Sequence, residues 1–187
     1  VMLFVDGENF TIRANERARA LRVELTRSCD VLKPGVCAWP KRWPPTLHPW
    51  ASDYGVERRV ERAYYYTHVV GPEGDVETLR RQLRGLGFAP RVFKKAKKEQ
   101  RAKGVDISIT TDALVHAFND NYDVFVLVSG DGDFAPLAQE LQRLGKIVVV
   151  SFFGEGAGLS PELKLVADMY QPFDILAVSY THLRAHE

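Results

Sequence analysis

The sequence contains little cysteine, no long apolar run and almost no net charge, and each of these absences excludes a class of protein. Its two cysteines, Cys29 and Cys37, are too few for a disulfide framework, and without added histidines they do not make a zinc site. The longest strongly apolar run, residues 147–153, is far shorter than the ~20 residues that a membrane-spanning helix needs. A formal net charge of +1 gives no general attraction to polyanions, so a nucleic-acid site would depend on local clusters of charge.

Two further absences concern targeting and nucleotide binding. No signal peptide precedes the first apolar run, because Asp6 interrupts that run almost at once. Together with the free thiols, this favours a cytoplasmic location and no association with a membrane. The sequence has neither a GxGxxG nor a GxxxxGK(S/T) motif, so binding of dinucleotides or nucleoside triphosphates is disfavoured.

The length and composition fit one soluble globular domain, which we place at residues 1–177. The proline-rich stretch at about residues 31–55 cannot sustain a helix or a central strand, and we interpret it as an insertion on the core of this domain. The last residues, 178–187, have no periodicity that fits the preceding sequence. They resemble translated vector sequence, and we expect no function from them.

Runs typical of strands alternate with runs typical of helices along the whole chain. The expected strands are residues 2–5, 60–68, 88–93, 124–128, 146–153 and, at an edge, 173–176. The expected helices are residues 8–28, 72–86, 104–119, 134–144 and 161–169. This alternation predicts parallel strands joined by crossover helices, and therefore a three-layer α/β/α sandwich with a mostly parallel, Rossmann-like sheet.

Acidic residues follow the expected strands at the places where such folds bind ligands. In an open parallel sheet, ligands bind beyond the carboxyl ends of the strands, near the point where the strand order reverses. The motif DGEN at residues 6–9 follows the first strand, and SGDGD at residues 129–133 follows the strand at residues 124–128. Asp106 begins a helix and can face the same edge. Three separate segments are therefore expected to bring carboxylates to one rim.

A carboxylate cluster of this kind points to a metal ion. One aspartate after a strand is more often a helix cap than a ligand, but several close carboxylates repel one another and need a compensating cation. An all-oxygen set of ligands suits Mg²⁺ or Mn²⁺, whereas zinc would favour histidine or cysteine ligands. Gly7, Gly130 and Gly132 allow the tight turns that would let the carboxylates converge.

Three motifs together resemble the NYN domain of the PIN-like nuclease superfamily, which includes the LabA-like proteins. They are DGEN at residues 6–9, KGVD at residues 103–106 with Asp112 six residues further on, and VSGDGDFAP at residues 128–136. The motifs occur in the order of the family and extend over roughly residues 2–153. DGEN alone is a weak signal, but SGDGDFAP after an apolar strand is specific.

The resemblance implies a metal-dependent endoribonuclease, a hydrolase that binds RNA and uses Mg²⁺ or Mn²⁺. Its metal ligands would be Asp6, Asp106, Asp131 and Asp133, with Asn9 as a neutral catalytic residue beside them.

Asp112 also matches the family motif, but its spacing from Asp106 argues against a shared ion. Six residues along a helix correspond to about 600° of rotation and ~9 Å of rise, so the two side chains point in different directions. Asp112 would instead contact the metal ligands without binding the ion itself, cap a neighbouring element or contact the substrate. Ser129 is expected to support the ligands in the same way.

A basic run precedes Asp106 and is the second indication of function. Six cationic residues fall within ten positions, opposed only by Glu99. A solvated surface loop and a site for the RNA backbone explain this run about equally well, and the second explanation predicts binding that weakens as salt rises. The predicted RNA contacts are Lys94, Lys95, Lys97, Lys98, Arg101 and Lys103.

Two other functions compete with that of a ribonuclease. A non-catalytic NYN module could bind RNA or protein as a regulator, although such a module has no reason to keep several clustered charges. A phosphohydrolase with an aspartyl nucleophile ranks last, because the position two residues after Asp6 is Glu8 and not a second aspartate.

Overall fold

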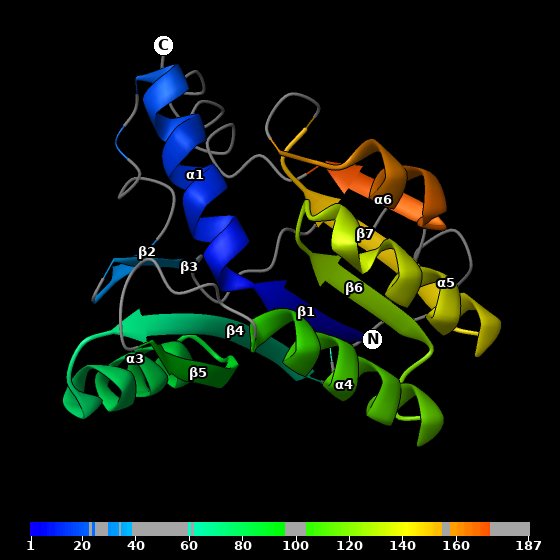
Figure 1. The fold of residues 1–187 in the computed structure, drawn as a ribbon, viewed down its shortest axis with the longest axis horizontal. Helices are drawn as coiled ribbons and strands as arrows, with labels where there is room; N and C mark the ends of the chain where they lie inside the picture. Colours follow the sequence, from blue (N-terminus) through cyan, green and yellow to red (C-terminus); the bar gives the residue numbers. More distant parts are fainter. Residues whose placement is uncertain are drawn as a thin grey trace, which may run out of the picture.

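A six-stranded sheet forms the centre of the computed structural model, and every pair of neighbouring strands in it is parallel (Figure 1). The structure describes residues 1–22, 24, 30–33, 35–38, 60, 62–95, 104–154 and 158–172. The sheet order is β5-β4-β1-β6-β7-β8. Its strands are β1 (Met2–Asp6), β4 (Arg62–Val70), β5 (Ala89–Lys95), β6 (Val124–Val128), β7 (Ile147–Phe152) and β8 (Met169–Pro172).

The strand order reverses between β1 and β6. From β1 the chain builds β4 and β5 on one side, and it then returns across β1 to build β6, β7 and β8 on the other. In a doubly wound sheet the connections leave such a point in opposite directions, which opens a crevice above the carboxyl ends of its two strands. Here that crevice lies between Asp6 and the residues that follow Val128.

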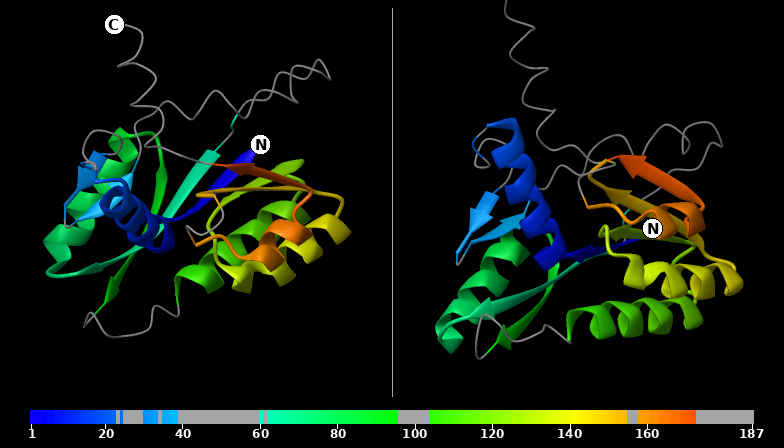
Figure 2. Two further views of the ribbon diagram at one scale, coloured as in Figure 1. Left: turned by 90° about the horizontal axis from the view of Figure 1, so that it is seen from above. Right: turned by 45° about the horizontal axis from the view of Figure 1, so that its top comes forward.

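Helices cover both faces of the sheet (Figure 2). The helices α1 (Gly7–Leu21) and α3 (Glu73–Gly85) pack on the half that contains β4 and β5. On the opposite face, α4 (Val105–Phe118) packs on β1 and β4, and α5 (Ala135–Arg143) packs on β7. The short helix α6 (Pro161–Val166) packs on α5 and on the 3-10 turn η3 (Gly132–Phe134). The predicted three-layer α/β class is confirmed.

The two strands beside the crevice are the most deeply buried part of the sheet. All five residues of β1 and all five of β6 are buried, as expected for strands covered by helices on both faces. Phe4 of β1 packs against Phe125 of β6 and Tyr64 of β4, with ring centroids 4.9 and 5.3 Å away. Each such aromatic side chain contributes roughly 1.5–3 kcal/mol on burial. This packing holds the carboxyl ends of β1 and β6 in fixed positions.

The start of the predicted insertion forms strands that the sequence analysis did not assign. They are β2 (Asp30–Leu32) and β3 (Val36–Ala38), which pair as an antiparallel hairpin separate from the central sheet. Gly35 allows the turn, since its φ of +108° is a conformation that glycine adopts without strain. The strand β3 is buried against α1, where the Cys37 N–H donates to Thr11 Oγ1 across 3.0 Å. All five prolines and all three tryptophans of the stretch lie outside the described residues.

Two predicted helices are shorter in the structure. The first ends at Leu21 instead of residue 28, because Arg22 takes a left-handed φ of 55° and its N–H caps the last turn. The last ends at Val166 instead of residue 169, and the chain then joins the sheet as β8. Just before β8, Asp168 accepts a hydrogen bond from the Val148 N–H of β7 across 2.7 Å, which ties this turn to the sheet. The predicted strand at residues 173–176 and the tail at residues 178–187 lie outside the described residues.

Among the helices of the described ranges, none combines the length and the apolar character that crossing a bilayer requires.

Candidate active site

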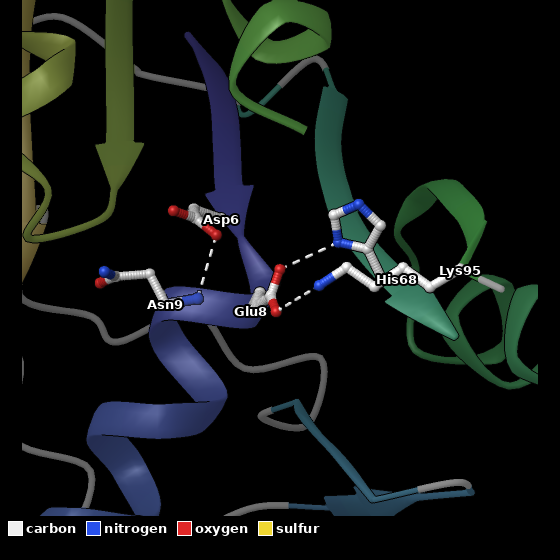
Figure 3. A network of polar contacts seen from close by, with 5 residues as sticks. All are labelled: Asp6, Glu8, Asn9, His68 and Lys95. Atoms are coloured by element: carbon white, nitrogen blue, oxygen red, sulfur yellow. Dashed lines mark hydrogen bonds and ion pairs between the residues drawn. The ribbon is translucent and has the colours of Figure 1, made fainter. Parts of the chain in front are cut away.

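Asp6 is the last residue of β1 and the N-cap of α1, so its carboxylate sits at the rim of the crevice. Its Oδ1 accepts a hydrogen bond from the Asn9 N–H across 3.0 Å, as an N-cap aspartate usually does (Figure 3). Its burial is unusual, because only 4% of the residue is exposed. Burial raises the pKa of Asp6 to about 7, and the charges of Asp106 and Asp131 also raise it. An ionised Asp6 is therefore costly unless a cation is near.

Ser129 connects Asp6 to the opposite side of the crevice. This fully buried residue follows β6 directly, and its Oγ donates to Asp6 Oδ2 across 3.1 Å. The same oxygen accepts a hydrogen bond from the Asp131 N–H across 3.2 Å. The hydroxyl group therefore fixes the second oxygen of Asp6 and the backbone that carries Asp131.

Asn9 makes a second connection between the two motifs. Its side-chain carbonyl Oδ1 accepts a hydrogen bond from the Gly130 N–H across 3.2 Å. Gly130 has no room for a side chain, since a Cβ there would lie 2.2 Å from the carbonyl oxygen of Gly158 and 2.6 Å from the ring of Phe152. Side chains from both motifs thus hold DGEN and SGDGD together. The two motifs lie more than 120 residues apart in the sequence.

The other predicted acidic ligands surround the mouth of the crevice. Asp131 is partly exposed, and its Oδ1 accepts a hydrogen bond from the Asp133 N–H across 3.0 Å at the start of η3. Asp133 is exposed. Asp106 lies in the first turn of α4 and is also exposed, although partial desolvation of its carboxyl group raises its pKa, as do the charges of Asp131 and Asp133. These carboxylates thus influence one another electrostatically.

The chemistry of these side chains fits a hard divalent cation, but their present arrangement does not enclose one. Within the described ranges, no three aspartate, glutamate, histidine or cysteine side chains converge closely enough to hold an ion. The available donors are carboxylate oxygens, which Mg²⁺ and Mn²⁺ prefer. Asp6 is fixed by two hydrogen bonds, whereas Asp106 and Asp133 reach solvent and can rotate. Convergence on Asp6 would therefore require at least a rotation of the exposed side chains.

A half-buried ionic network that no sequence motif indicates lies on the other side of Asp6 (Figure 3). The Oε1 atom of Glu8 accepts a hydrogen bond from Lys95 Nζ across 2.9 Å. Its Oε2 atom forms a second hydrogen bond, with His68 Nδ1, at the same distance of 2.9 Å. The His68 and Lys95 side chains are only 7% and 10% exposed. The hydrogen bond with His68, together with Lys95, lowers the pKa of Glu8 to about 2. Glu8 is thus committed to this network and is not a free ligand.

The predicted RNA-binding residues divide into three groups. Lys95 points inward to Glu8, which does not suit a contact with RNA. Lys94 is half exposed and pairs with Glu73 across 3.3 Å at the surface. The remaining predicted contacts, Lys97, Lys98, Arg101 and Lys103, lie outside the described residues.

Asp112 has its own partners. Its Oδ2 accepts hydrogen bonds from Tyr66 Oη across 2.8 Å and from Arg91 Nε across 3.1 Å. It makes no hydrogen bond with Asp6, Ser129 or Asp131. Tyr66 pairs with Asp6 across the β1–β4 ladder, so Asp112 is connected to the site only through a neighbouring strand.

The order of the motifs and their convergence on one crevice agree with a known family. The NYN domain family matches residues 1–175. The chain belongs to this family. The predicted resemblance is therefore confirmed, and NYN domains are nuclease-like members of the PIN-like superfamily. Membership of the LabA-like group stays a prediction.

Two other similarities accompany the NYN match. An uncharacterized protein of Methanocaldococcus jannaschii is 33% identical over 82 residues, which cover 44% of this chain and 30% of that protein. The matched part is therefore less than a third of the relative's length. A crystal structure of a protein of unknown function from Vibrio parahaemolyticus has a TM-score of 0.58 and 24% identity, and the match covers 92% of this chain and 91% of that one. At this identity the similarity supports the fold alone.

Proposed function

We propose that this NYN domain is a metal-dependent endoribonuclease that hydrolyses phosphodiester bonds of RNA. The observation that carries the proposal is the buried carboxylate of Asp6, which lies where the strand order reverses and is connected through Ser129 to Asp131. Perturbed carboxylates gathered in a crevice are typical of active sites. In this proposal Asp6, Asp106, Asp131 and Asp133 hold Mg²⁺ or Mn²⁺.

A bound divalent ion would supply neutralisation of the charge that develops on the phosphate and a water of lowered pKa. The residues of the chain would position the carboxylates that bind the ion. Ser129 and the Asn9 N–H fix both oxygens of Asp6, so this carboxylate needs little reorganisation when it binds a cation. Asn9 holds the Gly130 backbone and thereby the loop of Asp131. The exposed Asp106 and Asp133 would complete the set by rotation.

RNA as the substrate is part of the proposal and is supported by the family. The partly exposed Lys94 and the basic residues that precede Gly104 would attract the polyanion toward an otherwise acidic rim. The buried free thiol of Cys37 agrees with the proposed cytoplasmic location.

A second function is favoured by one observation. The described carboxylates do not converge on a common point, which suits an NYN module that binds RNA or protein as a regulator without cutting it. The two functions differ in whether metal produces any cleavage.

Cleavage of labelled single-stranded and structured RNA in Mn²⁺, Mg²⁺ or EDTA tests the proposal. We expect metal-dependent cutting that falls at least a hundredfold in Asp131→Asn. Asp123→Asn is the matched control, because Asp123 is an exposed aspartate that precedes the same strand, β6, at its opposite end. Intact RNA with undiminished RNA binding would reject the nuclease and support the regulator. A DNA strand of the same sequence measures the preference for RNA.

A further inference from the structure

A polar pocket of about 300 Å³ opens beside Asp131, on the side of the crevice away from the Glu8 network. Asn9 and Arg13 of α1 form one wall, residues 130–132 form the second, and residues 158–160 form the third. Asn9 and Arg13 are four positions apart on α1 and therefore share one face of that helix. In Figure 1 the start of α1 and the end of β6 lie side by side at this place, as the hydrogen bond between Asn9 and Gly130 requires.

Glycines give the pocket its room. A Cβ at Gly132 would lie 2.7 Å from the Ser160 hydroxyl, and a Cβ at Gly158 would lie 2.3 Å from Arg13 Nε. Gly158 also has a φ of +97°, which disfavours any other residue. Two walls therefore consist of bare backbone against which Arg13 and Ser160 pack. Side chains at these positions would displace the arginine from the pocket or fill the space.

Arg13 is the only cationic side chain among the described residues that line the pocket. Its side chain is 38% exposed, and Nη1 donates to Glu16 Oε2 across 2.8 Å. This pair lies on the surface of one helix and is screened by solvent, so it does not prevent Arg13 from binding another anion. A planar guanidinium group with free N–H donors matches the oxygens of a phosphate.

We propose that this pocket binds one sugar-phosphate unit of an RNA strand next to the phosphate that is cut, with its phosphate on Arg13. The inference rests on the proposed function, because it takes Asp131 as part of the cutting site. The pocket is polar, open to solvent and about the size of one nucleotide, which suits a chain that passes through it. Arg13 supplies a positive charge directly beside the acidic cluster, where a polyanion would otherwise be repelled. Asn9 also lines the pocket, and the Nδ2 group of its side chain can donate to the strand.

Binding and cutting of a short labelled RNA by the full chain and its Arg13→Ala variant test this subsite. Binding is measured in EDTA, so that it does not depend on cleavage. We expect Arg13→Ala to weaken binding about tenfold and to lower the slope of log K against log salt by roughly 0.7, the value of one contact to a single strand. In Mn²⁺ the same variant should raise KM more than it lowers kcat.

Arg143→Ala is the matched control. Arg143 also pairs with a glutamate on its own helix, Glu140 across 3.0 Å, but it lies at the end of α5 away from the pocket. We expect this variant to bind and cut RNA as the unaltered chain does. Equal losses in the two variants would mean a general effect of charge and would overturn the subsite.

Neutral methylphosphonate linkages, placed one at a time along the RNA, locate the contact. We expect one neutral linkage beside the cut site to weaken binding to the unaltered chain about tenfold. The Arg13→Ala variant should bind this RNA and the unsubstituted RNA with equal affinity. Unchanged affinity and salt slope in Arg13→Ala would overturn the subsite even if RNA is cut. If RNA is bound through Arg13 but never cut, the subsite stands and the proposed nuclease fails.

Discussion

Ser129 Oγ donates to Asp6 Oδ2 across 3.1 Å and so joins the ends of the two central strands, β1 and β6. Both residues are almost completely buried, and 123 positions separate them in the sequence. The serine hydroxyl also accepts from the Asp131 N–H, so one oxygen atom serves both sides of the crevice. The geometry of the acidic site therefore depends on a residue with no charge of its own.

Replacement of this hydroxyl tests that dependence. Ser129→Ala leaves the Asp131 N–H and one oxygen of Asp6 without their partner, and we expect the free energy of unfolding to fall by roughly 1–3 kcal/mol. Denaturant unfolding measures this loss. The double variant with Asp6→Asn should be less destabilised than the sum of the two single variants, because the changes affect one hydrogen bond. Strict additivity would contradict the connection.

The stability of the metal-free protein should depend on pH through Asp6. Its pKa of about 7 in the folded chain lies above the ordinary value of 3.8, so between these values the folded state holds a proton that the unfolded state releases. The stabilisation is complete below pH 3.8 and is lost as pH rises to about 7, by roughly 4 kcal/mol in total. Comparison of unfolding at pH 5 and pH 8 in EDTA measures the part of this loss that falls above pH 5, roughly 2–3 kcal/mol. Asp6→Asn should abolish most of it, and an equal pH dependence in the variant would disprove the assignment.

Glu8 should contribute stability with the opposite dependence on pH. Its pKa of about 2 lies below the ordinary value of 4.5, so its contribution is present above pH 4.5 and disappears as pH falls to about 2. Glu8→Gln should lower the free energy of unfolding at pH 7 by roughly 1–2 kcal/mol, after allowance for its 38% exposure. Glu140→Gln breaks a surface pair and should cost less than about 0.5 kcal/mol. Similar losses in both variants would argue against a special role of the network.

Gly130 packs so closely against the Gly158 backbone and the Phe152 ring that a side chain there should disturb the site. Gly130→Ala would place a Cβ against backbone and the Phe152 ring, and we expect a loss of roughly 2–3 kcal/mol together with loss of activity. Gly74→Ala is the control, because it lies in α3 with open space around it and should stabilise the chain by roughly 0.5–1 kcal/mol. Thermal unfolding of the two variants should thus shift in opposite directions. A neutral Gly130→Ala would show that the backbone can relax there.

The sequence predicted the parts of the fold and site that depend on local pattern. The apolar runs of β1 and β6 identify strands covered on both faces, and a parallel sheet then brings Asp6 and residues 129–133 to one edge. The Glu8 network depends instead on contacts with His68 and Lys95, which are 60 and 87 positions away, and no local pattern contains such contacts. The hairpin β2–β3 was not predicted, because each of its strands is only three residues long and lies in a stretch rich in proline and glycine.

A calorimetric titration of the protein with Mn²⁺ at pH 8 tests most directly whether the acidic residues around Asp6 hold a divalent ion. The proposed site predicts saturable binding of one or two equivalents of Mn²⁺ to the unaltered chain and to Asp123→Asn, with binding at least tenfold weaker in Asp6→Asn and Asp131→Asn. Absence of bound Mn²⁺ in the unaltered chain, or equal binding in all four proteins, would contradict the metal-dependent site.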